Sequence, residues 1–89
     1  MEVQEHRLKR LAMRSWRRGT KEMDLVLGPY ADARLAAMAE AEVQLYDQLL
    51  EENDQDLALW VTGVTLPPDL FAALIAEISG FARERLRQR

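Results

Sequence analysis

Apolar residues recur at the three- and four-residue spacing of an α-helix along most of this chain, and that periodicity restricts its fold more than any other feature. One such stripe comprises Leu8, Leu11, Ala12 and Ser15. The only β-branched cluster lies at residues 61–66, and Gly63 interrupts it. The sequence therefore predicts an all-α fold, a compact bundle of five to six short helices that forms a single domain over residues 1–89 with frayed termini.

Glycine, proline and capping residues set the expected ends of these helices. The predicted helices cover residues 2–17, 20–27, 39–51 and 55–62, with a short turn or helix at 32–37 and a last helix that begins in the Pro-Pro-Asp sequence at 67–69. The expected N-caps are Thr20, Asp32 and either Asn53 or Asp54. Gly19 is expected to end the first helix with a positive φ, Gly28 and Pro29 are expected to end the second, and Gly63 is expected to end the helix at 55–62. Gly80 costs the last helix about 1 kcal/mol relative to alanine, so we expect fraying beyond it.

The composition argues against several kinds of site. The chain has no cysteine, which excludes disulfides, thiolate metal ligands and cysteine nucleophiles. His6 is the only histidine and has no ligating partner at helical spacing, so we expect neither catalytic residues nor a metal site. A chain of 89 residues has little room for a deep substrate cavity beside its core, so the sequence predicts a protein that is not an enzyme.

Targeting and membrane signals are also missing from the sequence. No apolar run approaches the roughly 18 residues that a helical membrane span needs, so no membrane insertion is expected. The first eleven residues have early acids and no apolar segment, which is unlike a signal peptide, and they do not form a convincing transit peptide.

Positive charge is concentrated near the start of the chain. Seven of the twelve lysines and arginines lie between Arg7 and Lys21, whereas residues 35–82 contain nine acids and no lysine or arginine. The arginines that share one sector of the first helix are Arg7, Arg10, Arg14, Arg17 and Arg18. This stripe has three interpretations: a solvated face, a partner of the acidic middle of the same chain, or a surface that binds an acidic protein or phosphate groups.

Two sequence blocks carry a family resemblance. Residues 18–22 read Arg-Gly-Thr-Lys-Glu, an R-G-x-x-E motif, and Met23, Asp24 and Leu25 follow. The second block reads LYDQLLEENDQDLALW at 45–60, in which Leu57 and Trp60 are expected to be core residues. Over residues 10–65 the chain resembles the succinate dehydrogenase flavinylation factor family, the SdhE type, also called assembly factor 2 in mitochondria. It departs from the family in Asp54-Gln-Asp, where Asp-Pro-Asp is common, and in the Pro29-Tyr30 pair.

The resemblance implies a function in which this protein assists an enzyme. Members of the family bind the flavoprotein subunit of succinate dehydrogenase, or of its fumarate reductase relative, and promote covalent attachment of FAD to a histidine of that client. The implied factor has no cofactor of its own, and the covalent chemistry belongs to the client. The implied partner-binding residues are Arg18, Gly19, Glu22, Asp24, Arg14 and Arg17.

Arg18 and Glu22 have a structural alternative to their implied role. Arg18 could bind client carboxylate or carbonyl groups, or could form only a local salt bridge with Glu22 at a helix junction. Gly19 would leave the surface bare for a close approach of the client. The sequence ENDQD at 52–56 resembles a cation-binding loop, but capping of the next helix is the favoured interpretation there.

The resemblance also implies a setting for the protein. We expect a monomer, in the cytoplasm of a bacterium or in the mitochondrial matrix as a processed eukaryotic form. Nucleic acid is disfavoured as a partner because the basic stripe lacks interleaved aromatic residues and the rest of the chain is acidic. The alternative function is a small helical regulator, antitoxin-like or associated with nucleic acid, that uses the basic N-terminal face.

Overall fold

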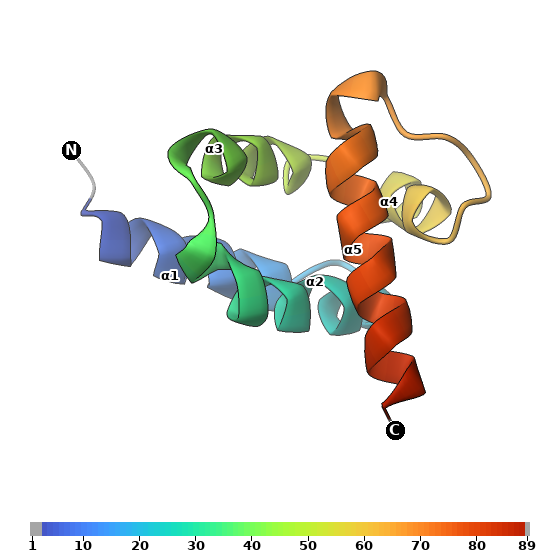
Figure 1. Cartoon of the computed structure of the whole chain (residues 1–89), viewed down its shortest axis with the longest axis horizontal. Helices are drawn as coiled ribbons and strands as arrows, with labels where there is room; N and C mark the ends of the chain where they lie inside the picture. Colours follow the sequence, from blue (N-terminus) through green and yellow to red (C-terminus); the bar gives the residue numbers. More distant parts are fainter. Residues whose placement is uncertain (1–2, 89) are drawn as a thin grey trace.

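The computed structural model describes residues 3–88, and these residues form five α-helices and one short 3-10 helix without any strand (Figure 1). The helices are α1 (Gln4–Trp16), α2 (Lys21–Arg34), η1 (Leu35–Ala37), α3 (Glu40–Leu49), α4 (Asp54–Val61) and α5 (Asp69–Arg87). The prediction of an all-α fold with five to six short helices is confirmed.

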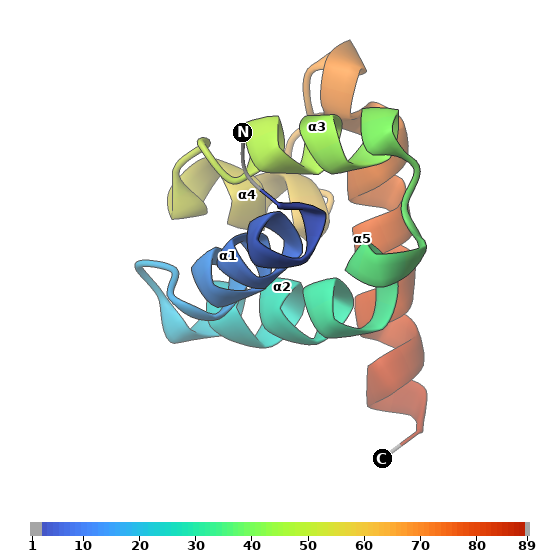
Figure 2. The same cartoon turned by 90° about the vertical axis from the view of Figure 1, so that its left-hand side faces the viewer.

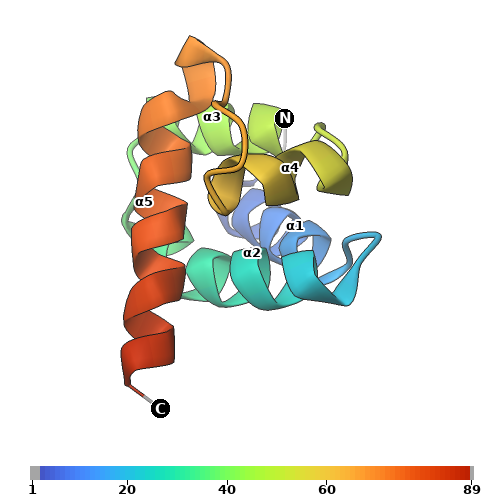
Figure 3. The same cartoon turned by 90° about the vertical axis from the view of Figure 1, so that its right-hand side faces the viewer.

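The first two helices form an antiparallel hairpin, and the later helices cover it. In Figure 1, α3 runs above α1 in the same direction, and Figure 2 shows α4 behind α3 and α1. The long helix α5 crosses the others at a steep angle, and its C-terminal end projects beyond α2, as Figures 1 and 3 both show. This arrangement encloses one core while leaving the end of α5 outside it.

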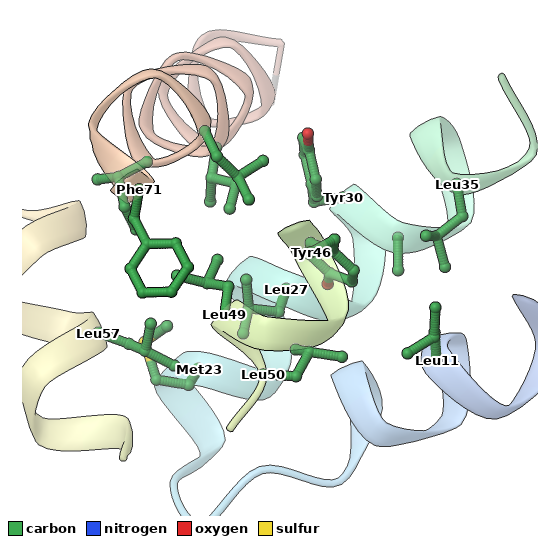
Figure 4. Close-up of a cluster of buried hydrophobic side chains, with 14 of the residues drawn as sticks. Leu11, Met23, Leu27, Tyr30, Leu35, Tyr46, Leu49, Leu50, Leu57 and Phe71 are labelled. Carbon is green, nitrogen blue, oxygen red and sulfur yellow. The ribbon is translucent and has the colours of Figure 1, made fainter. Parts of the chain in front are cut away.

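Every α-helix contributes to that core, part of which is drawn in Figure 4. The buried hydrophobic residues are Leu11, Met23, Leu27, Tyr30, Ala31, Leu35, Val43, Tyr46, Leu49, Leu50, Leu57, Phe71, Leu74, Ile75 and Ile78. The core position predicted for Leu57 is confirmed, since its side chain is fully buried. Trp60 is only partly buried and lies against Phe71 at the edge of the core, with 6.2 Å between ring centroids.

Polar groups within the core are paired. The hydroxyls of Ser15 and Tyr46 lie 2.6 Å apart, and Ser15 Oγ is also 2.8 Å from the Leu11 carbonyl oxygen. Burial raises the pKa of Tyr46 to about 12. Tyr30 donates its hydroxyl hydrogen to Glu77, and burial together with this contact raises the pKa of Tyr30 well above its ordinary value. Both hydroxyls are thereby kept in their neutral, protonated form.

Three of the expected helix boundaries are confirmed. Thr20 caps α2 by accepting a hydrogen bond from the Met23 amide, and Asn53 caps α4 by accepting one from the Asp56 amide. Gly63 follows α4 with a φ of 82° and ends that helix. Of the two caps left open for α4, the structure uses Asn53.

The prediction that Gly28 and Pro29 end the second helix is wrong, because α2 continues to Arg34. Gly28 is buried against the indole ring of Trp16, and a β-carbon at this position would overlap that ring. The glycine therefore serves the packing of α1 on α2. Pro29 removes one backbone donor within α2, so the Leu25 carbonyl four residues earlier has no partner in the helix. Arg85 of α5 donates to that carbonyl at 3.5 Å.

Two further boundaries differ from the sequence prediction. Asp32 does not cap a helix; it lies within α2 and accepts a hydrogen bond of 3.1 Å from Trp16 Nε1. Fraying beyond Gly80 is not seen, since α5 stays helical to Arg87. The intrinsic cost of one glycine is small compared with the burial of Phe71, Ile75 and Ile78 along the same helix.

Candidate partner-binding site

The R-G-x-x-E motif forms the turn between α1 and α2, and Arg18 holds this turn against the end of α3. Arg18 Nη1 donates to the carbonyl oxygen of Leu50 at 2.8 Å, and Nη2 donates to that of Glu52 at 2.7 Å. Leu50 is the C-cap of α3, where carbonyl groups lack helical partners and attract a cation. Arg18 thus completes a helix end that lies more than thirty residues away in the sequence.

Asp54 is the second brace of the turn. Its Oδ1 accepts a hydrogen bond of 2.8 Å from Arg18 Nε, and its Oδ2 accepts one of 2.8 Å from the Thr20 amide. The side chains of Arg18 and Asp54 are only 10% and 9% exposed. Because Asp54 is the first residue of α4, its carboxylate also lies near the positive end of that helix.

The close approach of the Asp54 carboxylate explains why position 19 is a glycine. A β-carbon on Gly19 would lie 3.1 Å from Asp54 Oδ2, tighter than an ordinary contact. The positive φ predicted for Gly19 is wrong, since among residues 3–88 only Gly63 has a positive φ. Gly19 thus leaves room for the Asp54 carboxylate. The helix α1 ends without a glycine in the left-handed conformation.

Asp24 supports the same turn from within α2. Its Oδ1 accepts a hydrogen bond of 2.5 Å from the Arg18 amide. Glu22 and Arg17 behave differently, because both are exposed and neither side chain makes a hydrogen bond or ion pair within the described part of the chain. The local salt bridge between Arg18 and Glu22 that the sequence left open is absent from residues 3–88; Arg18 pairs with Asp54 instead.

Acids of α3 and of the turn that follows it pair with two arginines of α1. Arg7 binds both carboxylate oxygens of Glu40, at 2.8 and 2.7 Å, and Arg14 binds Asp47 at 2.7 Å and Glu51 at 2.5 Å. The hydrogen bond from Arg7 is the main reason that the pKa of Glu40 lies below its usual value. Of the three interpretations of the arginine stripe, pairing with the acidic middle of the chain therefore holds for these two arginines and for Arg18.

A cationic groove of about 420 Å³ follows the outer side of α1 and ends at the turn. Its lining residues are His6, Lys9, Arg10, Met13, Arg14, Arg17 and Arg18. The structure thus brings three predicted site residues together in this groove, namely Arg14, Arg17 and Arg18, while Glu22 and Asp24 lie outside its lining. Cationic side chains around an exposed methionine are suited to an acidic protein segment.

The R-G-x-x-E turn is visible in the sequence, whereas the residue that fixes it is not. The sequence indicates only that Asp54 belongs to the second block and could cap a helix, although the excess of acids in the middle of the chain indicates that α1 could have internal partners. Nothing in the spacing of the sequence shows which acid meets which arginine, because the pairs are 33 to 37 residues apart.

The described residues form a small helical domain that presents a braced, charged turn. Charged side chains exposed beside such a turn are suited to binding another protein. Residues 3–88 contain no group of three or more side chains that could hold a metal ion. The family described as "Flavinator of succinate dehydrogenase" (Sdh5) matches residues 9–82. The chain belongs to this family, which confirms the resemblance identified in the sequence.

Individual relatives carry the name "Succinate dehydrogenase assembly factor 2, mitochondrial". The protein from Aspergillus terreus is 45% identical over 53 residues, which are 60% of this chain and 18% of that protein. The protein from Meyerozyma guilliermondii is 38% identical over 71 residues, 76% of this chain and 53% of its own. The protein from Drosophila grimshawi is 36% identical over 74 residues, 81% of this chain and 50% of its own. The chain thus spans between 18% and 53% of the length of these relatives.

None of the helices in the described residues, from α1 to α5, combines the length and the apolar character that crossing a bilayer requires.

Proposed function

We propose that this protein binds the flavoprotein subunit of succinate dehydrogenase, or of its fumarate reductase relative, and promotes the covalent attachment of FAD to that subunit. Family membership supports the proposal. The structural observation that carries it is the rigidly braced R-G-x-x-E turn, which leaves Glu22 and Arg17 exposed beside a bare glycine. Side chains on a fixed backbone lose little conformational freedom on binding, which favours a specific contact.

Five of the six site residues divide into two roles in this proposal. Arg17, Gly19 and Glu22 contact the client, because they are exposed at the turn. Arg18 and Asp24 are positioning residues that fix the turn from inside.

Arg14 is the sixth site residue and belongs to the wall of the cationic groove. Its ion pairs with Asp47 and Glu51 hold it in the groove that leads to the turn. An acidic segment of the client that lies along α1 would therefore be guided to Arg17 and Gly19.

The proposed mechanism is one of orientation. The factor needs no FAD of its own, because the flavin and the histidine that it joins belong to the client. Binding holds a mobile part of the client so that these two groups are aligned, and alignment alone can lower a barrier by several kcal/mol. We propose that the factor works as a monomer, in the cytoplasm of a bacterium or the mitochondrial matrix of a eukaryote.

The test compares two neighbouring substitutions, Glu22→Ala and Lys21→Ala. Both side chains are exposed in the first turn of α2 and make no hydrogen bond in the described structure, so removing either one changes stability by at most about 1 kcal/mol. Glu22→Ala is expected to weaken client binding about thirtyfold and to reduce covalent flavin, because it removes an interface contact. Lys21→Ala is expected to leave both unchanged.

The measurements are the affinity for the purified flavoprotein subunit and its covalent flavin fluorescence after denaturation. Equal behaviour of the two variants would exclude Glu22 from the interface. Failure of the unsubstituted protein to bind the subunit at all would overturn the proposed function itself.

A further inference from the structure

A groove of about 300 Å³ opens between α2 and the end of α5 that projects beyond the bundle in Figures 1 and 3. It is lined by Leu25, Val26, Ala82, Arg85 and Leu86. Leu25 is 53% exposed and Leu86 is 63% exposed. Single exposed leucines are common on protein surfaces, but two that line one groove between separate helices form a candidate interaction surface.

Arg85 gives the groove a polar edge. Its Nη1 donates to the Leu25 carbonyl that Pro29 leaves without a helical partner, and at 3.5 Å this bond is long. Within residues 3–88 the Arg85 side chain makes no other hydrogen bond or ion pair. A guanidinium has five N–H donors, so most of them remain available to a carboxylate that approaches the groove.

The groove adjoins the proposed docking turn. Leu25 lies three positions after Glu22 on α2, a spacing at which two side chains are neighbours on the helix surface. The charge of the region is also suited to an acidic partner, because Arg83, Arg85 and Arg87 are exposed at this end of α5. Glu84 is the only acid among them and lies 3.6 Å from Arg87.

We infer that this α2–α5 groove is a second contact site for the flavoprotein client, which inserts one large apolar side chain between Leu25 and Leu86 and places a neighbouring carboxylate on Arg85. The inference rests on the proposed function and extends the interface from the turn to the end of α5. The volume is at the lower limit of pockets that hold small molecules, which favours a side chain over a cofactor as the occupant.

A second copy of this chain fits the groove less well than the client does. Part of the negative charge of another copy is already paired with arginines of its own chain. Glu40, Asp47 and Asp54 are each bound by an arginine of α1 or of the turn after it. An acidic segment of a different protein has no such competing partner.

The experiment uses two leucines of the same helix. Leu86→Ser changes the groove, whereas Leu70→Ser changes a leucine that is 58% exposed at the opposite end of α5 and serves as the matched control. The expected result is that Leu86→Ser weakens binding of the purified flavoprotein subunit at least about fivefold, the effect of losing a useful interface side chain. Leu70→Ser is expected to stay within about twofold of the unsubstituted protein.

Arg85→Gln and Arg83→Gln form a second matched pair, because only Arg85 lines the groove. Arg85→Gln is expected to weaken binding at low salt and to reduce its salt dependence more than Arg83→Gln does. Circular dichroism checks that each variant keeps its helices. If Leu86→Ser loses helix, the Arg85 and Arg83 pair still decides the question.

The outcomes separate this inference from the proposed function. If the unsubstituted protein binds and Glu22→Ala weakens binding, but both groove variants match their controls, the groove is not a contact and the inference is wrong while the proposed function stands. Sedimentation that shows a dimer converted to a monomer by Leu86→Ser would identify the groove as a self-interface and would also overturn the inference. If the unsubstituted protein does not bind the subunit, both proposals fail together.

Discussion

Arg18 Nε and Asp54 Oδ1 lie 2.8 Å apart across 36 positions of sequence, and both side chains are about nine-tenths buried. The arginine caps the carbonyl end of α3, and the aspartate stands at the amino end of α4. Each charge is therefore favoured by a helix end as well as by its partner. The pair fixes the motif turn to the α3–α4 connection.

Asp54→Ala is expected to lower the free energy of unfolding by about 3 kcal/mol, because it leaves a buried guanidinium without its counter-charge and the Thr20 amide without its acceptor. Urea unfolding measured on the purified protein tests this value. The control is Asp56→Ala, which removes only a side-chain contact with Asn53 and should cost less than about 1 kcal/mol. Similar losses for the two variants would contradict the assigned role of Asp54.

Gly19→Ala is expected to destabilise the protein only by displacing the Asp54 carboxylate. The new β-carbon would press on Asp54 Oδ2, and no backbone strain is involved because φ is not positive. The cost should be at most about 1 kcal/mol, since one carboxylate shifts by a few tenths of an ångström. In an Asp54→Ala background the same substitution should cost nothing, so a double-mutant cycle measures the coupling. Additive effects of the two changes would rule out the contact.

Gly28→Ala and Gly80→Ala are expected to act in opposite directions, although both glycines lie inside helices. A β-carbon at Gly28 would overlap the indole of Trp16, which should cost about 1–3 kcal/mol. At Gly80 a β-carbon has no neighbour within 4 Å, so alanine should stabilise α5 by up to about 1 kcal/mol. Thermal melting of the two variants decides the matter, and stabilisation by Gly28→Ala would show that Trp16 is placed differently.

The two tyrosines of the chain should remain protonated at pH values where free tyrosine ionises. Burial raises the pKa of Tyr46 to about 12 and raises that of Tyr30 as well, both above the ordinary value of 10.0. Since the folded state favours the neutral form, the stabilisation is complete below pH 10 and is lost as the pH rises toward 12.

Near-ultraviolet absorbance of phenolate measures this directly. The folded protein is expected to show almost no phenolate at pH 10, whereas the urea-unfolded chain should be half ionised there. The free energy of unfolding should begin to decline near the same pH. Ionisation of one tyrosine at pH 10 in a protein that is still helical would contradict its burial.

The sequence predicted the helices better than it predicted their ends. Apolar periodicity identified α1, α3, α4 and α5, because amphipathic burial determines which segments become helical. The helix α2 was predicted from its cap Thr20, and its end was placed too early. Gly28, Pro29 and Gly80 were interpreted from intrinsic propensity, and tertiary packing overrode that propensity in each case. The indole of Trp16 needs the bare surface of Gly28, and Arg85 compensates the carbonyl that Pro29 exposes.

The R-G-x-x-E motif was also visible in the sequence. The sequence did not show which of its residues hold the turn and which stay exposed. R-G-x-x-E places Arg18 and Glu22 four residues apart, which suggests a mutual contact. In the structure Arg18 turns to Asp54 and two carbonyl oxygens, and Glu22 stays exposed. Such a choice depends on which distant segment lies beside the turn, and sequence spacing does not contain that information.

The brace on Arg18 also has a consequence for the order of events during protein synthesis. The whole R-G-x-x-E motif leaves the ribosome well before Leu50, Glu52 and Asp54, which follow Arg18 by 32, 34 and 36 positions. A nascent chain that ends before Asp54 therefore carries the complete motif on a turn that lacks its carboxylate brace. Under the proposed function, recognition of the folded turn must wait for the second half of the chain, so we expect an unfinished or prematurely terminated factor to compete poorly for the client.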